Sequence, residues 1–308
     1  MRCAATCVLL GHSLSPPFAQ FSNFIPLSLH QSAISIPHKT ITIVVQKTLP
    51  SIGRTWFFLL FLTMGACPSL VMYRILFAAL GCFMVATLVY TTVTDGSPFR
   101  PELLTPWMTA TLIDFYVNVL ALSVWVAYKE SSWVSSVIWI VLLVCFGSAA
   151  TCAYIVTKLF EISIQDPDQD PIDLLLVRSG QVVNVKRSYV SYGKYIFTIL
   201  GAFMVAVVTY TVVTDGLPFR KELLTPWMAA TLIDFYINVF AISLWIARKE
   251  TTWISACIWI IFLICLGSIT TCTYIVVQLS RLSSQDPVYH VLLNSSSRMG
   301  AIASTKKI

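Results

Sequence analysis

Long apolar segments alternate with short polar loops along most of this chain, and their lengths predict six membrane-crossing helices. We predict spans at 75–93, 106–126 and 133–159, and again at 195–213, 226–247 and 253–279. An α-helix needs about 20 mostly apolar residues to cross the hydrocarbon core of a bilayer. Thr105–Pro106 and Thr225–Pro226 indicate helix starts, because a capping residue precedes proline at the first helical position. The pattern predicts an all-α integral membrane protein.

The apolar pattern occurs twice because one unit is repeated. Residues 94–130 and 214–250 are identical at 28 of 37 positions, and most differences exchange one apolar residue for another. We predict the first three-helix unit at 72–164, a polar linker at 165–191, the second unit at 192–282 and a polar C-terminal tail at 283–308. The repeat therefore predicts a 3+3 arrangement of transmembrane helices.

The odd number of predicted spans in each unit has a consequence for topology. If the linker stays on one side of the membrane, the second unit enters in the opposite sense to the first. That arrangement is an inverted-topology repeat about a pseudo-two-fold axis in the membrane plane. With this arrangement the Lys and Arg residues near the spans are nearly balanced between the two faces, so they assign no orientation.

Residues 1–71 form an N-terminal extension of different composition. It contains Ser and Pro but no acidic residue, since the first Asp or Glu of the chain is Asp95. This composition is typical of an organelle transit peptide; the alternative is an extension with little structure or function. We predict that it is mostly disordered, apart from a short apolar helix at 55–71 that Pro68 interrupts.

Composition supports the membrane assignment and excludes one class of partner. Hydrophobic residues make up 57% of the chain and charged residues 11%, whereas soluble domains carry about 25% charged residues. The net charge of +6 is spread over loops and tails without the basic stripe of a nucleic-acid-binding surface. The predicted partner is the lipid bilayer of the endomembrane system or plasma membrane, or of a plastid if the extension is a transit peptide. The oligomeric state is not predicted.

The residues that usually carry metal or covalent chemistry lie in unsuitable places. All four histidines are in the tails, and the nine cysteines include no CxxC pair. Cys145 and Cys152, with their copies Cys265 and Cys272, are spaced to share one helix face; they indicate packing, with a metal or redox pair as the alternative. We predict no cofactor, no metal site, no catalytic residue and no enzyme activity.

One polar stripe follows the second predicted helix of each unit. It consists of Thr111, Asp114 and Asn118 in the first unit and Thr231, Asp234 and Asn238 in the second. Asp114 lies eight residues past Pro106, roughly 12 Å along the helix and near the bilayer midplane. An aspartate there costs about 2.5–3.5 kcal/mol on insertion, so it should face the bundle interior or water. Inverted units would bring Asp114 and Asp234 close together.

This stripe supports two interpretations. As a functional site, it would bind a proton, a cation or a small polar solute in a transporter- or channel-like bundle. As a structural cluster, it would hold the helices in register through hydrogen bonds worth about 0.6 kcal/mol each. A third interpretation, a lipid-modifying enzyme, lacks the reactive groups it would need.

The polar loop before this helix contains a second candidate motif. Its charged residues are Asp95, Arg100 and Glu102, repeated as Asp215, Arg220 and Glu222. They could form a gate or a partner-binding surface, and the latter would make the protein a non-catalytic scaffold or assembly factor. The alternative is a solvated loop with local charge pairs of small energetic value.

The repeated motifs TDGxPFRxELLTPWMxATLIDFY and WxxxxIWIxxLxCxGS resemble those of a family of plant multi-span membrane proteins known as domain of unknown function 1475. The resemblance covers about residues 72–293 and is carried by both copies. It implies a plant multi-span membrane protein, and it brings no activity, substrate or catalytic residue.

Overall fold

The computed structural model describes residues 70–162, 171–176, 187–218, 220, 223–282 and 291–292. All of them belong to one compact unit, residues 42–308. The predicted N-terminal extension, with its apolar helix at 55–71, lies outside the described residues except for Leu70 and Val71.

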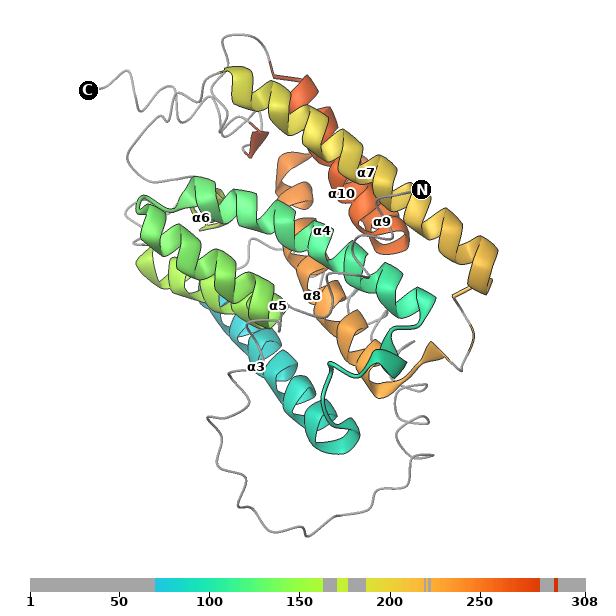
Figure 1. The fold of residues 1–308 in the computed structure, drawn as a ribbon. Helices are drawn as coiled ribbons and strands as arrows, with labels where there is room; N and C mark the ends of the chain where they lie inside the picture. Colours follow the sequence, from blue (N-terminus) through green and yellow to red (C-terminus); the bar gives the residue numbers. More distant parts are fainter. Residues whose placement is uncertain are drawn as a thin grey trace, which may run out of the picture. The chain divides into compact units, whose positions relative to one another are not determined.

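The described part of the chain is helical and contains no strand. The elements of the first copy are α3 (Leu70–Asp95), η3 (Pro101–Leu103), α4 (Pro106–Lys129), α5 (Trp133–Glu161) and α6 (Pro171–Leu176). Those of the second are α7 (Arg187–Asp215), α8 (Pro226–Lys249), α9 (Trp253–Leu266) and α10 (Ser268–Ser280) (Figure 1). By length and composition alone, α3, α4, α5, α7 and α8 could cross a membrane, but α5 is interrupted at Gly147. The predicted all-helical integral membrane protein is confirmed at this level.

Helix boundaries follow local signals where these exist. The Thr105 hydroxyl accepts a hydrogen bond from the Met108 amide at 3.2 Å, and Thr225 caps α8 in the same way. The helices α3 and α7 begin before the predicted spans, and the start of α7 at Arg187 lies inside the predicted linker. The first turns of α7 are polar, so hydropathy alone places its start too late, whereas α3 begins with the apolar residues Leu70–Met72 and continues through Tyr73 and Arg74.

The third predicted span of each copy is broken at a glycine. Gly147 within α5 has φ 54° and ψ −129°, and Gly267 between α9 and α10 has φ 55° and ψ −128°. These angles are far from helical values, and glycine reaches positive φ without the steric penalty of a Cβ. The predicted continuous spans at 133–159 and 253–279 are therefore wrong.

At each break the chain reverses direction. The rings of Trp139 and Tyr154 have centroids 5.0 Å apart, whereas a straight helix would separate them by roughly 22 Å. Trp259 and Tyr274 are related in the same way, also at 5.0 Å. Each broken segment is thus a helical hairpin (Figure 1). We name residues Trp133–Glu161 hairpin 1 and residues Trp253–Ser280 hairpin 2.

The hairpins overturn the predicted inverted topology. Each copy contains two full-length helices plus a hairpin that returns to its starting side, so the second copy begins on the same side as the first. We call this side of the bundle the linker end and the opposite side the loop end. At the loop end, Trp107 and Met108 of α4 pack against Trp227 and Met228 of α8, so these two helices run in the same direction. The pseudo-two-fold axis that relates the copies therefore runs along the bundle, from the linker end to the loop end.

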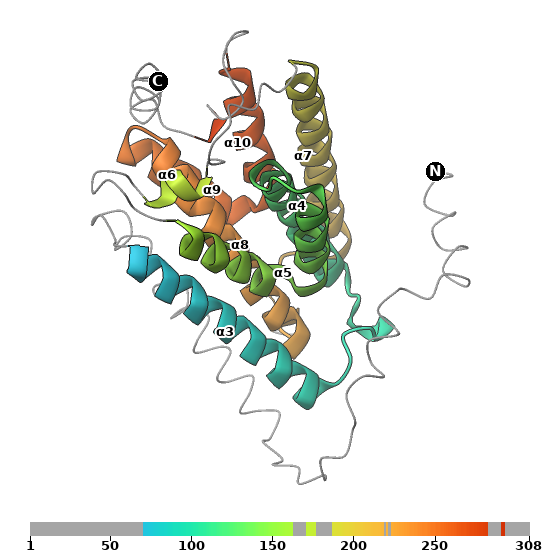
Figure 2. The ribbon, with the colours of Figure 1, turned by 90° about the vertical axis from the view of Figure 1, so that its left-hand side faces the viewer.

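The two copies interlock rather than pack as separate bundles. Helix α3 lies against hairpin 1 and α8, while α7 lies against α10 and α4 (Figure 2). The close approach of α3 depends on Gly81, since a Cβ there would lie 3.1 Å from Cys152 Cβ; Gly201 and Cys272 repeat this contact at 3.2 Å. Small residues allow such approach where lipid provides little hydrophobic drive between helices.

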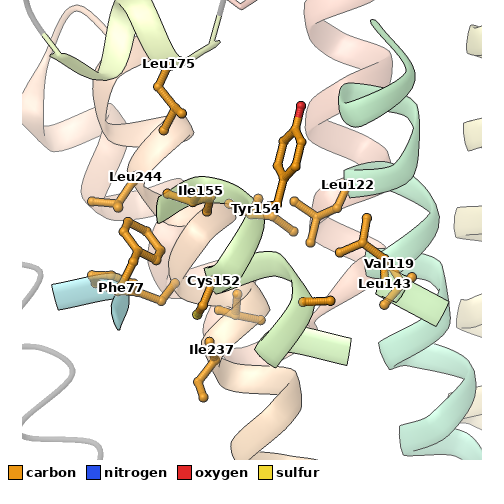
Figure 3. Packing of buried hydrophobic residues seen from close by; sticks show 14 of the residues in the cluster. Phe77, Val119, Leu122, Leu143, Cys152, Tyr154, Ile155, Leu175, Ile237 and Leu244 are labelled. Carbon is orange, nitrogen blue, oxygen red and sulfur yellow. The ribbon is translucent and has the colours of Figure 1, made fainter. Parts of the chain in front are cut away.

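The main core cluster combines residues from both copies. Phe77, Val119, Cys152, Ile237 and Leu244 meet in it, from α3, α4, hairpin 1 and α8 (Figure 3). Cys152 and Cys272 are each 1% exposed and act as packing residues. Their predicted partners on the same face, Cys145 and Cys265, lie on the opposite arms of the hairpins because the glycine break intervenes.

Candidate functional site

Each stripe aspartate binds the broken hairpin of the other copy. Asp114 Oδ1 on α4 accepts a hydrogen bond from the Ser268 amide of hairpin 2 at 2.7 Å. Asp234 Oδ1 on α8 accepts one from the Ser148 amide of hairpin 1 at 2.6 Å. Both serines are the first residues of a returning arm, where amides lack intrahelical partners and the helix dipole favours negative charge. The aspartates therefore act as helix caps supplied by the neighbouring copy.

The two glycine breaks make room for these carboxylates. A Cβ on Gly267 would collide with both carboxylate oxygens of Asp114, and a Cβ on Gly147 would collide with those of Asp234. The ring of Phe115 would also lie 2.8 Å from a Cβ on Gly147. Glycine is thus required at each break both for the positive φ and for the close approach of an aspartate.

An asparagine lies one turn beyond each aspartate. Asn118 Oδ1 accepts a hydrogen bond from the Thr271 hydroxyl at 2.7 Å, and Asn238 Oδ1 accepts one from the Thr151 hydroxyl at 2.8 Å. Both asparagines are 0% exposed, and neither amide nitrogen has a hydrogen-bond partner among the described residues. A buried donor left unpaired costs about 1–3 kcal/mol, so each nitrogen needs an acceptor from water or a ligand.

The remaining predicted stripe residues are placed differently. Thr111 donates to the Trp107 carbonyl at 2.8 Å and Thr231 to the Trp227 carbonyl at 2.9 Å, so both hydroxyls are used within their own helices. The two half-buried aspartates do not pair with each other in the described part of the chain, since each binds the opposite hairpin. The stripe therefore forms two equivalent sites. In each site, one Asp and one Asn of a full-length helix bind the Ser and Thr of a returning hairpin arm.

The charged residues of the loop motif form ion pairs within their own loop. Arg100 pairs with the Asp95 carboxylate at 3.0 Å, and Arg220 pairs with Asp215 at 2.7 Å. Glu102 is exposed in η3, and Glu222 lies outside the described residues. This geometry favours the local-pairing interpretation.

A cluster that sequence reasoning missed joins the two arms of each hairpin at the linker end. Glu130, 8% exposed, accepts hydrogen bonds from Ser135 at 2.8 Å and Tyr154 at 2.9 Å and pairs with Lys158 at 2.8 Å. Burial by itself raises the pKa of Glu130, but these donors together bring that pKa below the ordinary value of 4.5.

Hairpin 2 has an equivalent cluster around Glu250. This carboxylate accepts from Ser255 at 2.7 Å, Tyr274 at 2.9 Å and Gln278 at 3.3 Å. The available signal in the sequence was that the glutamate, serine and tyrosine occur at identical spacing in both copies. The contact could not be recognised from the sequence, because the glutamate and the tyrosine are 24 positions apart and meet only when the chain reverses direction between them.

No group of three or more His, Cys, Asp or Glu side chains that could hold a metal ion occurs in the described ranges. The polar side chains at the two capped breaks offer carboxylate, carboxamide and hydroxyl groups. These groups suit a proton or a hydrogen-bonding solute.

A family model described as "Protein of unknown function (DUF1475)" matches residues 64–299. No curated protein and no solved structure matches the chain.

Proposed function

We propose that this chain, which belongs to the DUF1475 family of proteins of unknown function, is a transporter-like membrane protein whose site is the pair of capped helix breaks. The observation that carries the proposal is that Asp114 and Asp234 each cap the broken hairpin of the other copy. Within a bilayer, interrupted helices are tolerated where they are buried in protein or line a water-filled cavity. Discontinuous helices near the midplane form the substrate and ion sites of many transporters.

The depth of the breaks supports this assignment. Asp114 is the ninth residue of the 24-residue helix α4, and it meets Ser268 at the tip of hairpin 2. Both hairpin tips therefore lie in the middle part of the bundle. A proton or a small polar solute that reaches this depth would meet an aspartate acceptor and an asparagine donor in each copy.

The competing interpretation is that the caps only hold the two copies together. A purely structural junction would satisfy its polar groups internally. The unpaired amide nitrogens of Asn118 and Asn238 are the features that such a junction does not require. They favour a site that receives an acceptor from outside the protein.

The test is proton flux into liposomes that contain the purified protein and an entrapped pH-sensitive dye. Asp114→Asn and Asp234→Asn keep an oxygen that accepts the serine amide but remove the charge. We expect both variants to fold and to lose the flux signal of the wild type. Thr111→Val is the matched control, since its hydroxyl serves only its own helix. Wild-type flux in both aspartate variants, or no flux in the wild type, would refute the proposal.

The scaffold alternative would use the loop charges to bind a partner. It is weakened because Arg100 and Arg220 already pair with aspartates of their own loops. A scaffold would lose partner binding when Arg100 or Arg220 is replaced and would tolerate changes at the aspartates. Pull-down of partners from native membranes with Arg100→Gln and Asp114→Asn separates the two functions.

The parallel arrangement also supports an orientation. Among the described side chains, the basic residues at the linker end are Arg74, Lys129, Lys158, Lys194, Arg248, Lys249 and Arg281, whereas those at the loop end are Arg100 and Arg220. Loops rich in Lys and Arg stay on the cytoplasmic side. We therefore propose that the linker end faces the cytoplasm and the loop end the lumen or exterior.

A further inference from the structure

A cavity of about 710 Å³ lies between the two copies in the linker half of the bundle. Equivalent residues of both copies line it, among them Ala121 with Ala241 and Trp125 with Trp245. Its size falls within the range of about 300–1,000 Å³ that small-molecule sites occupy. The cavity therefore lies on the pseudo-two-fold axis of the molecule.

The cavity reaches the site described above and is blocked beyond it. Thr271, which donates to Asn118, forms part of its wall. Toward the loop end, the axis is filled by the packed side chains of Trp107, Met108, Trp227 and Met228. At the linker end, α6 and Val291–Leu292 border the cavity with apolar side chains.

The walls specify an apolar ligand that carries one hydrogen-bond acceptor. Most wall residues are aliphatic or aromatic, so a small polar solute would leave them in contact with water or a void. The indole nitrogen of Trp125 donates to the Leu176 carbonyl at 3.3 Å, whereas the buried indole nitrogen of Trp245 has no partner among the described residues. Trp245 lines the cavity, and a hydrogen-bond acceptor on a ligand there would satisfy this nitrogen.

Basic side chains near the linker end favour an acidic head group on the ligand, although none of them lines the cavity wall. Arg74 lies beside the wall residues Tyr73 and Leu159, where it donates to the Leu159 carbonyl at 2.6 Å and stacks on Phe160 at 4.6 Å. Lys129 donates to the Leu174 carbonyl of α6 at 2.8 Å, next to the cavity wall. Basic side chains outnumber carboxylates among the described residues of this end, so an anion is favoured there over a cation.

We propose that the axial cavity binds an amphiphilic carboxylic acid, with its apolar body between the two copies and its carboxylate toward the basic linker end. The further statement that this acid, rather than a small polar solute, is moved past the capped breaks rests on the proposed transport function. The acid would enter past α6 and Val291–Leu292 at the linker end, because the loop end of the axis is closed.

The test measures quenching of tryptophan fluorescence by 9,10-dibromostearic acid, with the full chain in phosphatidylcholine nanodiscs. Bromine quenches at contact, and Trp125 and Trp245 line the cavity. We expect saturable quenching by the acid. The methyl ester should bind at least about tenfold more weakly, because a charge-assisted hydrogen bond contributes on that order.

Ala241→Phe fills the cavity and should abolish the saturable component. Val141→Phe, at a lipid-facing position that is 54% exposed, adds similar bulk and should leave it unchanged. Saturable quenching that survives Ala241→Phe would overturn the proposal. Equal quenching by a dibrominated phosphatidylcholine would also overturn it, because the occupant would then be a bilayer lipid.

A second measurement covers the case in which Ala241→Phe does not fold. Wild-type protein is photolabelled with a diazirine-bearing palmitic acid, and the labelled peptides are mapped by mass spectrometry. Labels at 121–125 and 241–245 support the cavity site, whereas labels confined to outward residues such as Val141 and Val144 contradict it. Loss of acid binding with intact proton flux defeats this inference alone, and intact binding without flux defeats the transport function alone.

Discussion

The sharpest prediction concerns Gly267, whose missing side chain makes room for Asp114. In Gly267→Ala, the new Cβ would lie 2.8 Å from Asp114 Oδ1 and 2.9 Å from Asp114 Cγ, with the second carboxylate oxygen closer still. The backbone would also have to hold φ 55° with an alanine. The substitution therefore both strains the backbone and displaces the cap of α10.

The expected loss follows from these two effects. A residue forced into a sparsely populated backbone region costs about 1–3 kcal/mol. Loss of a helix cap costs about 1 kcal/mol. We expect Gly267→Ala to lower the free energy of unfolding by about 2–4 kcal/mol, which corresponds to a fall in melting temperature of roughly 5–10 °C.

The assay is thermal unfolding of the purified protein in detergent, with Gly96→Ala as the control. Gly96 has φ 76°, and a Cβ added there would have no atom within 4 Å, so its substitution reports backbone strain alone. In an Asp114→Ala background, Gly267→Ala should cost about 1 kcal/mol less than in the wild type, because the displaced cap is already gone. Equal losses for Gly267→Ala and Gly96→Ala, or strict additivity with Asp114→Ala, would refute the reasoning.

Three further predictions test other parts of the structure. Accessibility reporters in the linker and in the C-terminal tail should both report the cytoplasm, with a reporter after Ser97 on the other side; linker and tail on opposite faces would restore the inverted arrangement. The folded-state pKa of Glu130 lies below 4.5, so its stabilisation is present above the unfolded-state pKa and is lost as the pH falls through the folded value. Glu130→Gln should therefore melt below wild type at pH 7, and the gap should shrink below about pH 4. Trp107→Phe removes a hydrogen bond of 3.1 Å to the Gly216 carbonyl and should cost about 1 kcal/mol, whereas Trp227→Phe, whose indole nitrogen has no partner among the described residues, should cost less.

Much of the local structure was predictable because its causes are local. The proline at the first position of α4 and the Thr105 cap are encoded by adjacent residues, and the structure begins the helix there. The inward direction of Asp114 and Asn118 follows from the cost of exposing them to lipid. The repeat of all these signals in the second copy is visible by direct comparison of the two halves.

The candidate site was predictable only in part. The sequence placed Asp114 and Asn118 on one face of a helix at mid-depth, yet their partners Ser268 and Thr271 are some 150 positions away. Thr111 shared the same face and proved to be used within its own helix. Helical spacing shows which side chains share a face, but it does not show which distant segment of the chain packs against that face.

By itself, the sequence determined an all-helical membrane protein built from one unit used twice, because apolar length, capping residues and internal identity are properties of neighbouring positions. Only the tertiary structure decided the topology. Gly147 and Gly267 sit in apolar runs long enough to cross, and hydropathy is the same for a helix that continues and for one that turns back. What makes the reversal stable is the aspartate of the other copy at each returning arm, a contact that exists only after the two copies pack together.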